Sequence, residues 1–256
     1  MSDDRIYAVG DVHGHLDKLR EAHRRITLDC VEAGGPAPVV HVGDLVDRGP
    51  DSRGVIDFLK GGLARDEDWI VIRGNHDQLL VDFVRGSDGS SDMLRDGLTW
   101  LHDRMGGART LESYGAKKRT LETRATFHRR AREAVLSDHV AFIEALPLWY
   151  RAKGMIFVHA GIRPGFPMEA QDEADLLWIR DEFLWHLNDH EALVVHGHTP
   201  VDAPTHYGNR VNIDTGAGWG KELVPVVFDG GVCFALTPEG REPVKAPRFG
   251  MRVRPE

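Results

Sequence analysis

The most constraining feature of this sequence occurs six times: a short run of β-branched and other apolar residues is followed at once by a loop with Asp, Asn or His. The loops are residues 10–14, 43–49, 74–77, 159–161, 196–199 and 214–216. Stretches with helical spacing separate the first three runs, which favours an α/β fold with a largely parallel sheet. Ligands bind at the carboxyl ends of strands in such sheets, so the six loops would meet at one site.

Three helices are expected after the first three loops. Apolar residues recur at helical spacing between residues 14 and 33, which predicts the first helix. Asp51 can cap a second helix, which the glycine pair 61–62 should end. A third helix is predicted after residue 77, where apolar residues again recur at helical spacing.

The pattern changes from residue 86 to about 139, where the sequence is helical, polar and basic and has no strand-like run. We interpret this stretch as a helical insertion into a single domain of 256 residues, and most of its cations as a solvated helical face. Further along, short strands at 224–228 and 232–236 predict an antiparallel second sheet. The tail from Pro238 is expected to be an extended surface segment.

Composition excludes several classes of partner. The formal charge of -8 disfavours a broad contact with nucleic acid or an anionic membrane, so we expect neither as a partner. No signal-peptide pattern or long apolar run is present, and the cytoplasm is the expected location. Cys30 and Cys233 lie far apart in the sequence and are expected to be free, buried thiols.

The loop at residues 43–49 places two carboxylates and a guanidinium between glycines, which suits a cation and a phosphate bound side by side. Together the loops offer oxygen and imidazole ligands, a set that suits Mn, Fe or Zn better than Ca or Mg. Six ligands exceed the protein's share for one ion. With Asp44 as a bridge they fit two ions roughly 3.5–4 Å apart, which would lower the pKa of a shared water. The candidate ligands are Asp11, His13, Asp44, Asn75, His159 and His198.

These loops resemble the motifs of calcineurin-like metallophosphoesterases, and specifically the phosphoprotein phosphatase family of bacterial and phage Ser/Thr phosphatases. The resemblance spans residues 6 to about 236. Each motif alone is weak, but five in the right order are a strong signal. They read Gly-Asp-Val-His-Gly at 10–14, Gly-Asp-Leu-Val-Asp-Arg-Gly at 43–49, Gly-Asn-His-Asp at 74–77, His-Ala-Gly at 159–161 and Gly-His-Thr at 197–199. The resemblance implies a four-layer α/β/β/α sandwich and hydrolysis of phosphomonoesters by direct attack of a metal-bridging hydroxide.

The resemblance also implies how the two metals are held. Mn is the expected ion, with Fe or Zn as alternatives. One metal would bind Asp11, His13 and Asp44, and the other would bind Asp44, Asn75, His159 and His198.

The same comparison assigns the remaining catalytic roles. His76 resembles the general acid that protonates the leaving alkoxide, and Asp47 resembles its partner, since an adjacent carboxylate keeps the imidazole charged and oriented. Arg48 and Arg73 look like the phosphate-binding arginines. Arg180 would be a third, in a segment that varies more within the family.

Histidines outside this set are assigned hydrogen-bonding, structural roles. They are His15, His41, His102, His128, His139, His186, His190 and His206. In the nuclease-like branch of the superfamily an extra ligand lies two residues after the position of His198, and here that residue is Pro200. His196 is therefore expected beside the metals rather than on them, and Asp214 is expected to brace neighbouring loops.

Two enzymatic functions remain open. A Ser/Thr protein phosphatase is favoured because Asp47 is present, whereas a sister group of symmetrical dinucleoside polyphosphate hydrolases usually has Ala there. Asp77, in place of the Glu commoner in protein phosphatases, and Trp219, a possible base-stacking platform, favour the hydrolase of diadenosine tetraphosphate. The substrate is accordingly expected to be a phosphoprotein or a phosphorylated small molecule. A binding module without catalysis would require loss of a ligand or of the acid, and none is lost.

Overall fold

The computed structural model describes residues 4–95 and 97–246. Its first sheet has the strand order β11-β10-β9-β1-β2-β3, with β1, β2 and β3 parallel to one another and the other three antiparallel. The parallel strands are β1 (Ile6–Val9), β2 (Val39–His41) and β3 (Trp69–Val71). The antiparallel strands are β9 (Val226–Asp229), β10 (Val232–Thr237) and β11 (Gly240–Pro243).

A second sheet has the order β4-β5-β6-β8-β7, in which β5, β6 and β8 are parallel. The edge strands β4 and β7 pair antiparallel with their neighbours. The strands are β4 (Trp149–Ala152), β5 (Met155–Val158), β6 (Leu193–His196), β7 (Thr205–His206) and β8 (Arg210–Asn212). The parallel strands of both sheets thus end in the six loops that the sequence singled out.

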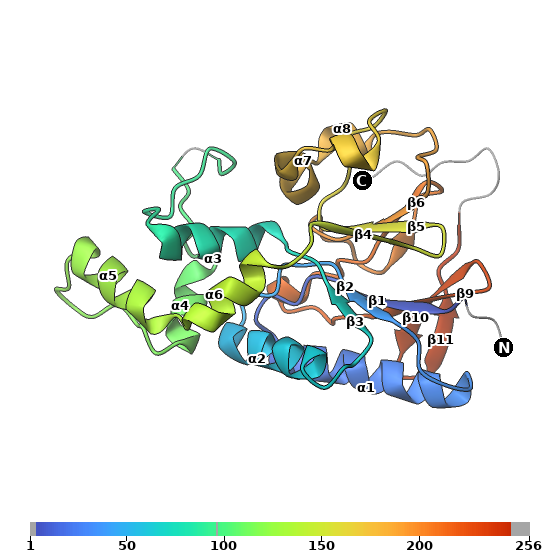
Figure 1. Cartoon of the computed structure of the whole chain (residues 1–256), viewed down its shortest axis with the longest axis horizontal. Helices are drawn as coiled ribbons and strands as arrows, with labels where there is room; N and C mark the ends of the chain where they lie inside the picture. Colours follow the sequence, from blue (N-terminus) through green and yellow to red (C-terminus); the bar gives the residue numbers. More distant parts are fainter. Residues whose placement is uncertain (1–3, 96, 247–256) are drawn as a thin grey trace.

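The two sheets pack face to face. The side chains of β1, which point alternately to its two faces, show how the layers form. Ile6 and Ala8 point into the core between the sheets, where Phe157 and Val211 of the second sheet meet them. Tyr7 belongs to the core on the outer face of the first sheet, because successive side chains of a strand point to opposite faces. Figure 1 shows the resulting four layers, so the predicted α/β/β/α sandwich is confirmed.

Helices cover both outer faces of the sandwich. The first sheet is covered by α1 (Leu16–Glu32), α2 (Ser52–Leu63) and α3 (Asn75–Arg85), each of which follows a parallel strand as predicted. The Asp51 side chain accepts a hydrogen bond from Gly54 N and so caps α2. The second sheet carries α7 (Glu173–Trp178), α8 (Asp181–Leu184) and a 3₁₀ turn, Met168–Ala170. A further 3₁₀ turn is Ala217–Trp219.

Two sequence predictions were wrong. The strands near the C-terminus are antiparallel, but they extend the first sheet beside β1, and the second sheet is made of β4 to β8 instead. The segment after Pro238 is extended and largely exposed as predicted, with Gly240–Pro243 pairing with β10 as an edge strand, while residues 247–256 lie outside the described residues. Helix α2 runs through the glycine pair at 61–62, where the Trp69 ring packs so closely on Gly62 that no side chain would fit.

The segment from 86 to 139 contains α4 (Gly107–Ser113), α5 (Arg124–Ala134) and the start of α6 (Ser137–Glu144), and no strand among its described residues. Figure 1 shows these helices in green at one end of the molecule. Its buried side chains, Trp100 among them, belong to the same apolar core as α1 to α3. The insertion is therefore packed onto the sandwich as part of its core.

No helix in the described residues is long and apolar enough to cross a membrane. Both cysteines are free, as predicted. Cys233 is buried, which raises the pKa of its thiol to about 12, whereas Cys30 is only partly buried.

Two histidines pair where α1 lies against the first sheet. The Nε2 atoms of His23 and His41 are 2.9 Å apart, and Trp69 packs on both rings. Burial, with a smaller contribution from His41, lowers the pKa of His23 from 6.5 to about 3, and burial lowers that of His41 to about 4. The unfolded chain would take up these protons near pH 6.5, so the pair should lower stability progressively as the pH falls below that value.

We expect His23→Gln to make the fold less sensitive to acid, because an amide can donate to His41 but does not titrate. Between pH 7 and pH 5 the free energy of unfolding of the unchanged chain should fall by about 2 kcal/mol more than that of the variant. Urea denaturation at the two pH values measures this difference. The exposed His102→Gln is the matched control, and identical acid sensitivity of His23→Gln and the unchanged chain would contradict the assignment.

Candidate metal centre

The loop after β2 is held by backbone contacts that only glycine allows. A Cβ on Gly43, whose φ is +96°, would lie 2.6 Å from Gly74 N, and a Cβ on Gly74 would lie 2.2 Å from Asp44 N. The Asp77 carboxylate joins the same two loops, since it accepts hydrogen bonds from Leu45 N at 2.9 Å and from Gly74 N at 2.8 Å. This close crossing fixes the position of Asp44.

Left-handed backbone is concentrated in these loops. Among the described residues, five of the eight non-glycine residues with positive φ come from the strand-end loops. They are His13, Asp44, Asp47, Arg48 and His198, with φ between 47° and 75°. Such conformations cost energy for side chains other than Gly, and they gather where surrounding structure holds functional groups in place.

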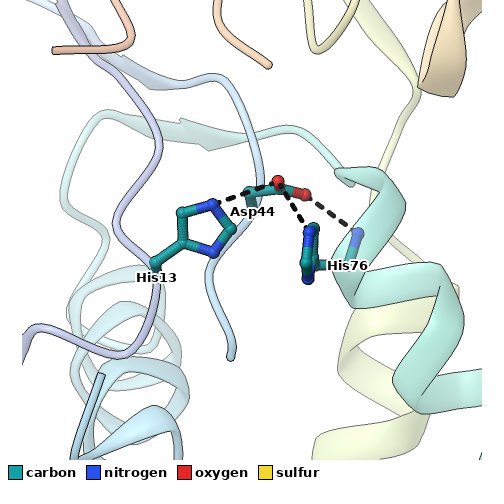
Figure 2. Close-up of side chains that lie close together, drawn as sticks. All are labelled: His13, Asp44 and His76. Atoms are coloured by element: carbon teal, nitrogen blue, oxygen red, sulfur yellow. Dashed lines mark hydrogen bonds and ion pairs between the residues drawn. The ribbon is translucent and has the colours of Figure 1, made fainter. Parts of the chain in front are cut away.

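Asp44 lies at the centre of the site. Its Oδ2 is 3.4 Å from His13 Nε2 and 4.0 Å from His76 Nε2, and its Oδ1 is 3.4 Å from His159 Nε2. Oδ1 also accepts a hydrogen bond of 2.9 Å from His76 N in the first turn of α3, where the helix dipole favours a negative charge. Figure 2 shows the Asp44 carboxylate between the two rings of His13 and His76.

A second group of ligand atoms lies on the Oδ1 side of Asp44. His159 Nε2 is 2.8 Å from Asn75 Oδ1 and 3.2 Å from His198 Nδ1, and the last two atoms are 2.9 Å apart. The ligand atoms of His13, Asp44 and His76 form one compact group, and those of Asp44, His159 and His198 form another. Asp44 belongs to both groups, which is the place that the sequence predicted for a bridging carboxylate.

The orientation of the rings fits divalent cations. His13 Nδ1 donates to Val46 O and His159 Nδ1 donates to Val42 O, both at 2.9 Å, so each Nε2 carries a lone pair. In that tautomer His159 Nε2 and Asn75 Oδ1 present two lone pairs to each other at 2.8 Å, which a shared cation would stabilise. The buried Nε2 of His198 has no hydrogen-bond partner.

The charges in the site also favour bound cations. Burial lowers the pKa of His13, His159 and His198, so these rings are neutral and can bind metal. Burial, followed by repulsion from Asp214 and Asp44, raises the pKa of Asp11 well above its ordinary value. A bound cation would relieve the repulsion among these carboxylates.

Asp11 does not join either compact group in this structure. Its carboxylate accepts hydrogen bonds from His198 N at 3.0 and 3.3 Å. The side chain beside His13 and His76 is Arg48. Its Nη1 contacts His13 Nε2, and its Nη2 is 3.1 Å from His76 Nε2. The Arg48 guanidinium is therefore the positive charge beside His13 and His76, and it also lies over the Trp219 ring at 4.5 Å.

His76 and Asp47 lie together as the sequence predicted. The two are joined by a hydrogen bond of 2.6 Å between His76 Nδ1 and Asp47 Oδ2, and both side chains are buried. Nε2 of His76 therefore faces Asp44 and Arg48, and these three residues line one cleft.

A cleft of about 500 Å³ lies above the ligand atoms. Arg48 and Arg180 line it, and Arg180 also donates to Thr199 Oγ1 at 3.1 Å. Arg73 does not line it: its guanidinium donates to Glu173 at 3.2 Å, at the start of α7. Arg95 and Arg104 of the insertion, which sequence reasoning left out, line the cleft instead, and so does Trp178.

Two further residues escaped sequence reasoning because they lie in the insertion. Trp100 Nε1 donates to Asp47 Oδ2 at 2.7 Å, and Thr110 Oγ1 donates to Asp47 Oδ1 at 2.6 Å. The sequence feature that could have indicated such a contact is a tryptophan inside a polar stretch. His196 Nε2 lies 3.2 Å from Arg210 Nη1. Asp214, which was expected to brace neighbouring loops, accepts from Gly216 N at 2.9 Å and hydrogen-bonds the Asp11 side chain of another strand-end loop.

Comparisons with known proteins identify the family of the chain. Residues 4–224 match the family model of the calcineurin-like phosphoesterases. The chain is 26% identical over 246 residues to the bis(5'-nucleosyl)-tetraphosphatase PrpE (asymmetrical) of Oceanobacillus iheyensis, with 88% of each chain covered. It is 29% identical over 227 residues to serine/threonine-protein phosphatase 1 of Salmonella typhimurium, covering 85% of this chain and 89% of that protein.

A solved structure shares the fold. The cold-active protein-tyrosine phosphatase of a psychrophilic Shewanella species superimposes with a TM-score of 0.64 and 15% identity, over 96% of this chain and 83% of that one. At this identity the similarity concerns the fold alone. The family model covers most of the chain, and the chain therefore belongs to the calcineurin-like phosphoesterase family.

Proposed function

We propose that this protein is a metal-dependent phosphomonoesterase that hydrolyses esters with poor leaving groups, such as phosphoserine and phosphothreonine in proteins. The observation that carries the proposal is the buried His76–Asp47 pair, joined at 2.6 Å, with the other ring nitrogen facing the cleft. An alkoxide leaves readily only if an acid protonates it. A phosphate or nucleotide leaving group needs far less help.

The metal ligands are assigned on the same basis. Asp44 would bridge two divalent ions, with Mn²⁺ as our first choice. When bound, the ions would lower the pKa of the attacking water and neutralise phosphate charge. The other ligands would be Asp11, His13, Asn75, His159 and His198, for which Asp11 would have to turn from its contact with His198 N.

The chain's own cations would bind the phosphoryl group. Arg48 and Arg180 line the same cleft as Asp44, and planar guanidinium groups hold phosphate oxygens through paired hydrogen bonds. Binding of phosphate would draw Arg48 away from His76 Nε2, which it contacts here, and leave that nitrogen free to carry the proton. Arg73 would contribute only after release from Glu173.

A second candidate function is hydrolysis of dinucleoside polyphosphates. Two arginines besides Arg48 and Arg180 line the cleft and could bind further phosphates: Arg95 and Arg104. The tryptophans Trp178 and Trp219 line it as well. Nucleobases stack on such rings. The PrpE relative also bears the name of a tetraphosphatase.

Parallel assays with a phosphothreonine peptide and diadenosine tetraphosphate test the two candidates. The Mn²⁺-loaded protein should have the higher kcat/KM on the peptide. A preference for the dinucleotide would reverse the order of the candidates, and the nucleotide products would then show whether cleavage is symmetrical. Activity on neither substrate would refute both.

Asp44→Asn should abolish binding of two metal ions, because a neutral amide is a much poorer bridge between two dications than a carboxylate. Elemental analysis after dialysis should find fewer than two ions per chain. Asp82→Asn is the matched control, since that carboxylate accepts from Gln78 Nε2 on α3 and is not a proposed ligand. Two tightly bound ions in Asp44→Asn would show that Asp44 does not bridge.

His76→Asn separates acid catalysis from a structural role. The variant should lose on the order of 10² to 10⁴ in kcat with an alkyl phosphate, and much less with p-nitrophenyl phosphate, whose leaving group scarcely needs a proton. Metal content should stay unchanged. Asp47→Asn should show the same dependence on the leaving group but a smaller loss, because the His76 imidazole is still present and only its partner is removed. Equal losses on both substrates would mean that His76 binds phosphate or water and is not the acid.

A further inference from the structure

The insertion reaches the catalytic pair through two buried side chains. Trp100 and Thr110 are fully buried, and each donates one hydrogen bond to a different oxygen of the Asp47 carboxylate. Together with His76 Nδ1, Asp47 therefore receives three donors within 2.7 Å. Three short, buried bonds leave this carboxylate no freedom to rotate.

The same segment also holds the backbone of the loop. Asp47 N donates to Thr110 Oγ1 at 2.8 Å and to Ser52 Oγ at 3.1 Å, while Arg48 N donates to Gly106 O at 3.4 Å. Asp47 and Arg48 both have left-handed backbone, with φ of 75° and 65°, a conformation that needs support from its surroundings. Residues 100–110 supply much of that support.

Residues 100–110 are tightly packed against α3 and the catalytic loop. The Trp100 ring lies 4.9 Å from the Phe83 ring of α3, and a Cβ on Gly107 would come within 2.4 Å of the indole. A Cβ on Gly106 would lie 2.4 Å from Arg48 N. The insertion therefore contacts the catalytic loop directly through Trp100, Gly106 and Thr110.

We infer that Trp100 and Thr110 are positioning residues for the general acid: they orient Asp47, and through it the His76 ring. This inference rests on the proposed phosphomonoesterase function. Without the two donors the carboxylate could turn about its side-chain bonds, and the His76 ring that it holds could turn with it. The insertion at 86–139 would then be part of the catalytic machinery and not only a wall of the cleft.

Two variants each remove one donor to the Asp47 carboxylate. Trp100→Phe deletes the indole N–H and leaves a smaller ring, whereas Thr110→Val keeps the side-chain shape but also removes the acceptor of Asp47 N. Trp69→Phe is the matched control, because it makes the same change on the outer face of the first sheet, where the ring packs on His23, His41 and Phe58. Thr110→Ser restores the hydroxyl and serves as the rescue. Thermal melts and metal analysis establish that each variant is folded and loaded before any rate is compared.

We expect Trp100→Phe and Thr110→Val each to lower kcat for an alkyl phosphate by about 10- to 100-fold, the range typical for loss of an orienting partner. Hydrolysis of p-nitrophenyl phosphate, KM and metal content should change little, and Thr110→Ser should behave like the unchanged protein. A merely structural role would lower both rates together, or neither, and either result would overturn the inference.

A second measurement does not depend on turnover. In Zn²⁺-loaded protein the proton between His76 Nδ1 and Asp47 should give a downfield NMR signal that His76→Asn removes. Trp100→Phe should shift this signal, whereas Trp69→Phe should not; an unchanged signal in Trp100→Phe would refute the inference. If the unchanged protein hydrolyses neither substrate, the proposed function fails, and the NMR comparison still decides whether the donors orient the pair.

Discussion

The structure depends on one constraint: a carboxylate, Asp44, is buried at the crossing of two strand-end loops. A buried charge must be paired, and here a helix amide donates to Asp44 while ring nitrogens from three different loops lie within 4.0 Å of it, placed to share a bound cation with it. The glycines that let the loops touch, and the left-handed backbone beside them, follow from the need to bring these groups together. A pair of divalent cations would complete the balance of charge.

The insertion links the stability of the fold to the chemistry of the site. Its apolar side chains belong to the same core as the helices of the first sheet, so it cannot move independently of them. Two of its buried polar side chains donate to Asp47, the partner of the proposed general acid. Its remaining cations are mostly paired on the surface, as Arg130 is with Glu122 at 2.9 Å, or face the cleft, as Arg104 does.

The cleft offers chemistry for two kinds of leaving group. A firmly oriented acid is needed for an alkoxide, whereas additional arginines and exposed indole surface suit a longer anionic chain that ends in a base. The position of Trp219, half exposed and stacked on the Arg48 guanidinium, joins the two features in one place. Arg48 thus contacts both His76 and the indole, and in the proposed function it would also bind phosphate.

The sequence alone determined the six strand-end loops, the order of the first three strands and helices and the chemical type of every proposed ligand, because these follow from local periodicity and short motifs, whereas the pairing of His76 with Asp47 was implied by the family resemblance. Only the tertiary structure decided that β9 and β10 join the first sheet, that Arg73 pairs with Glu173, and that Asp11 contacts His198 N. It alone also brought Trp100 to Asp47, 53 residues away in the chain. Strand pairing and side-chain contacts over such separations depend on packing of the whole core, which no local pattern records.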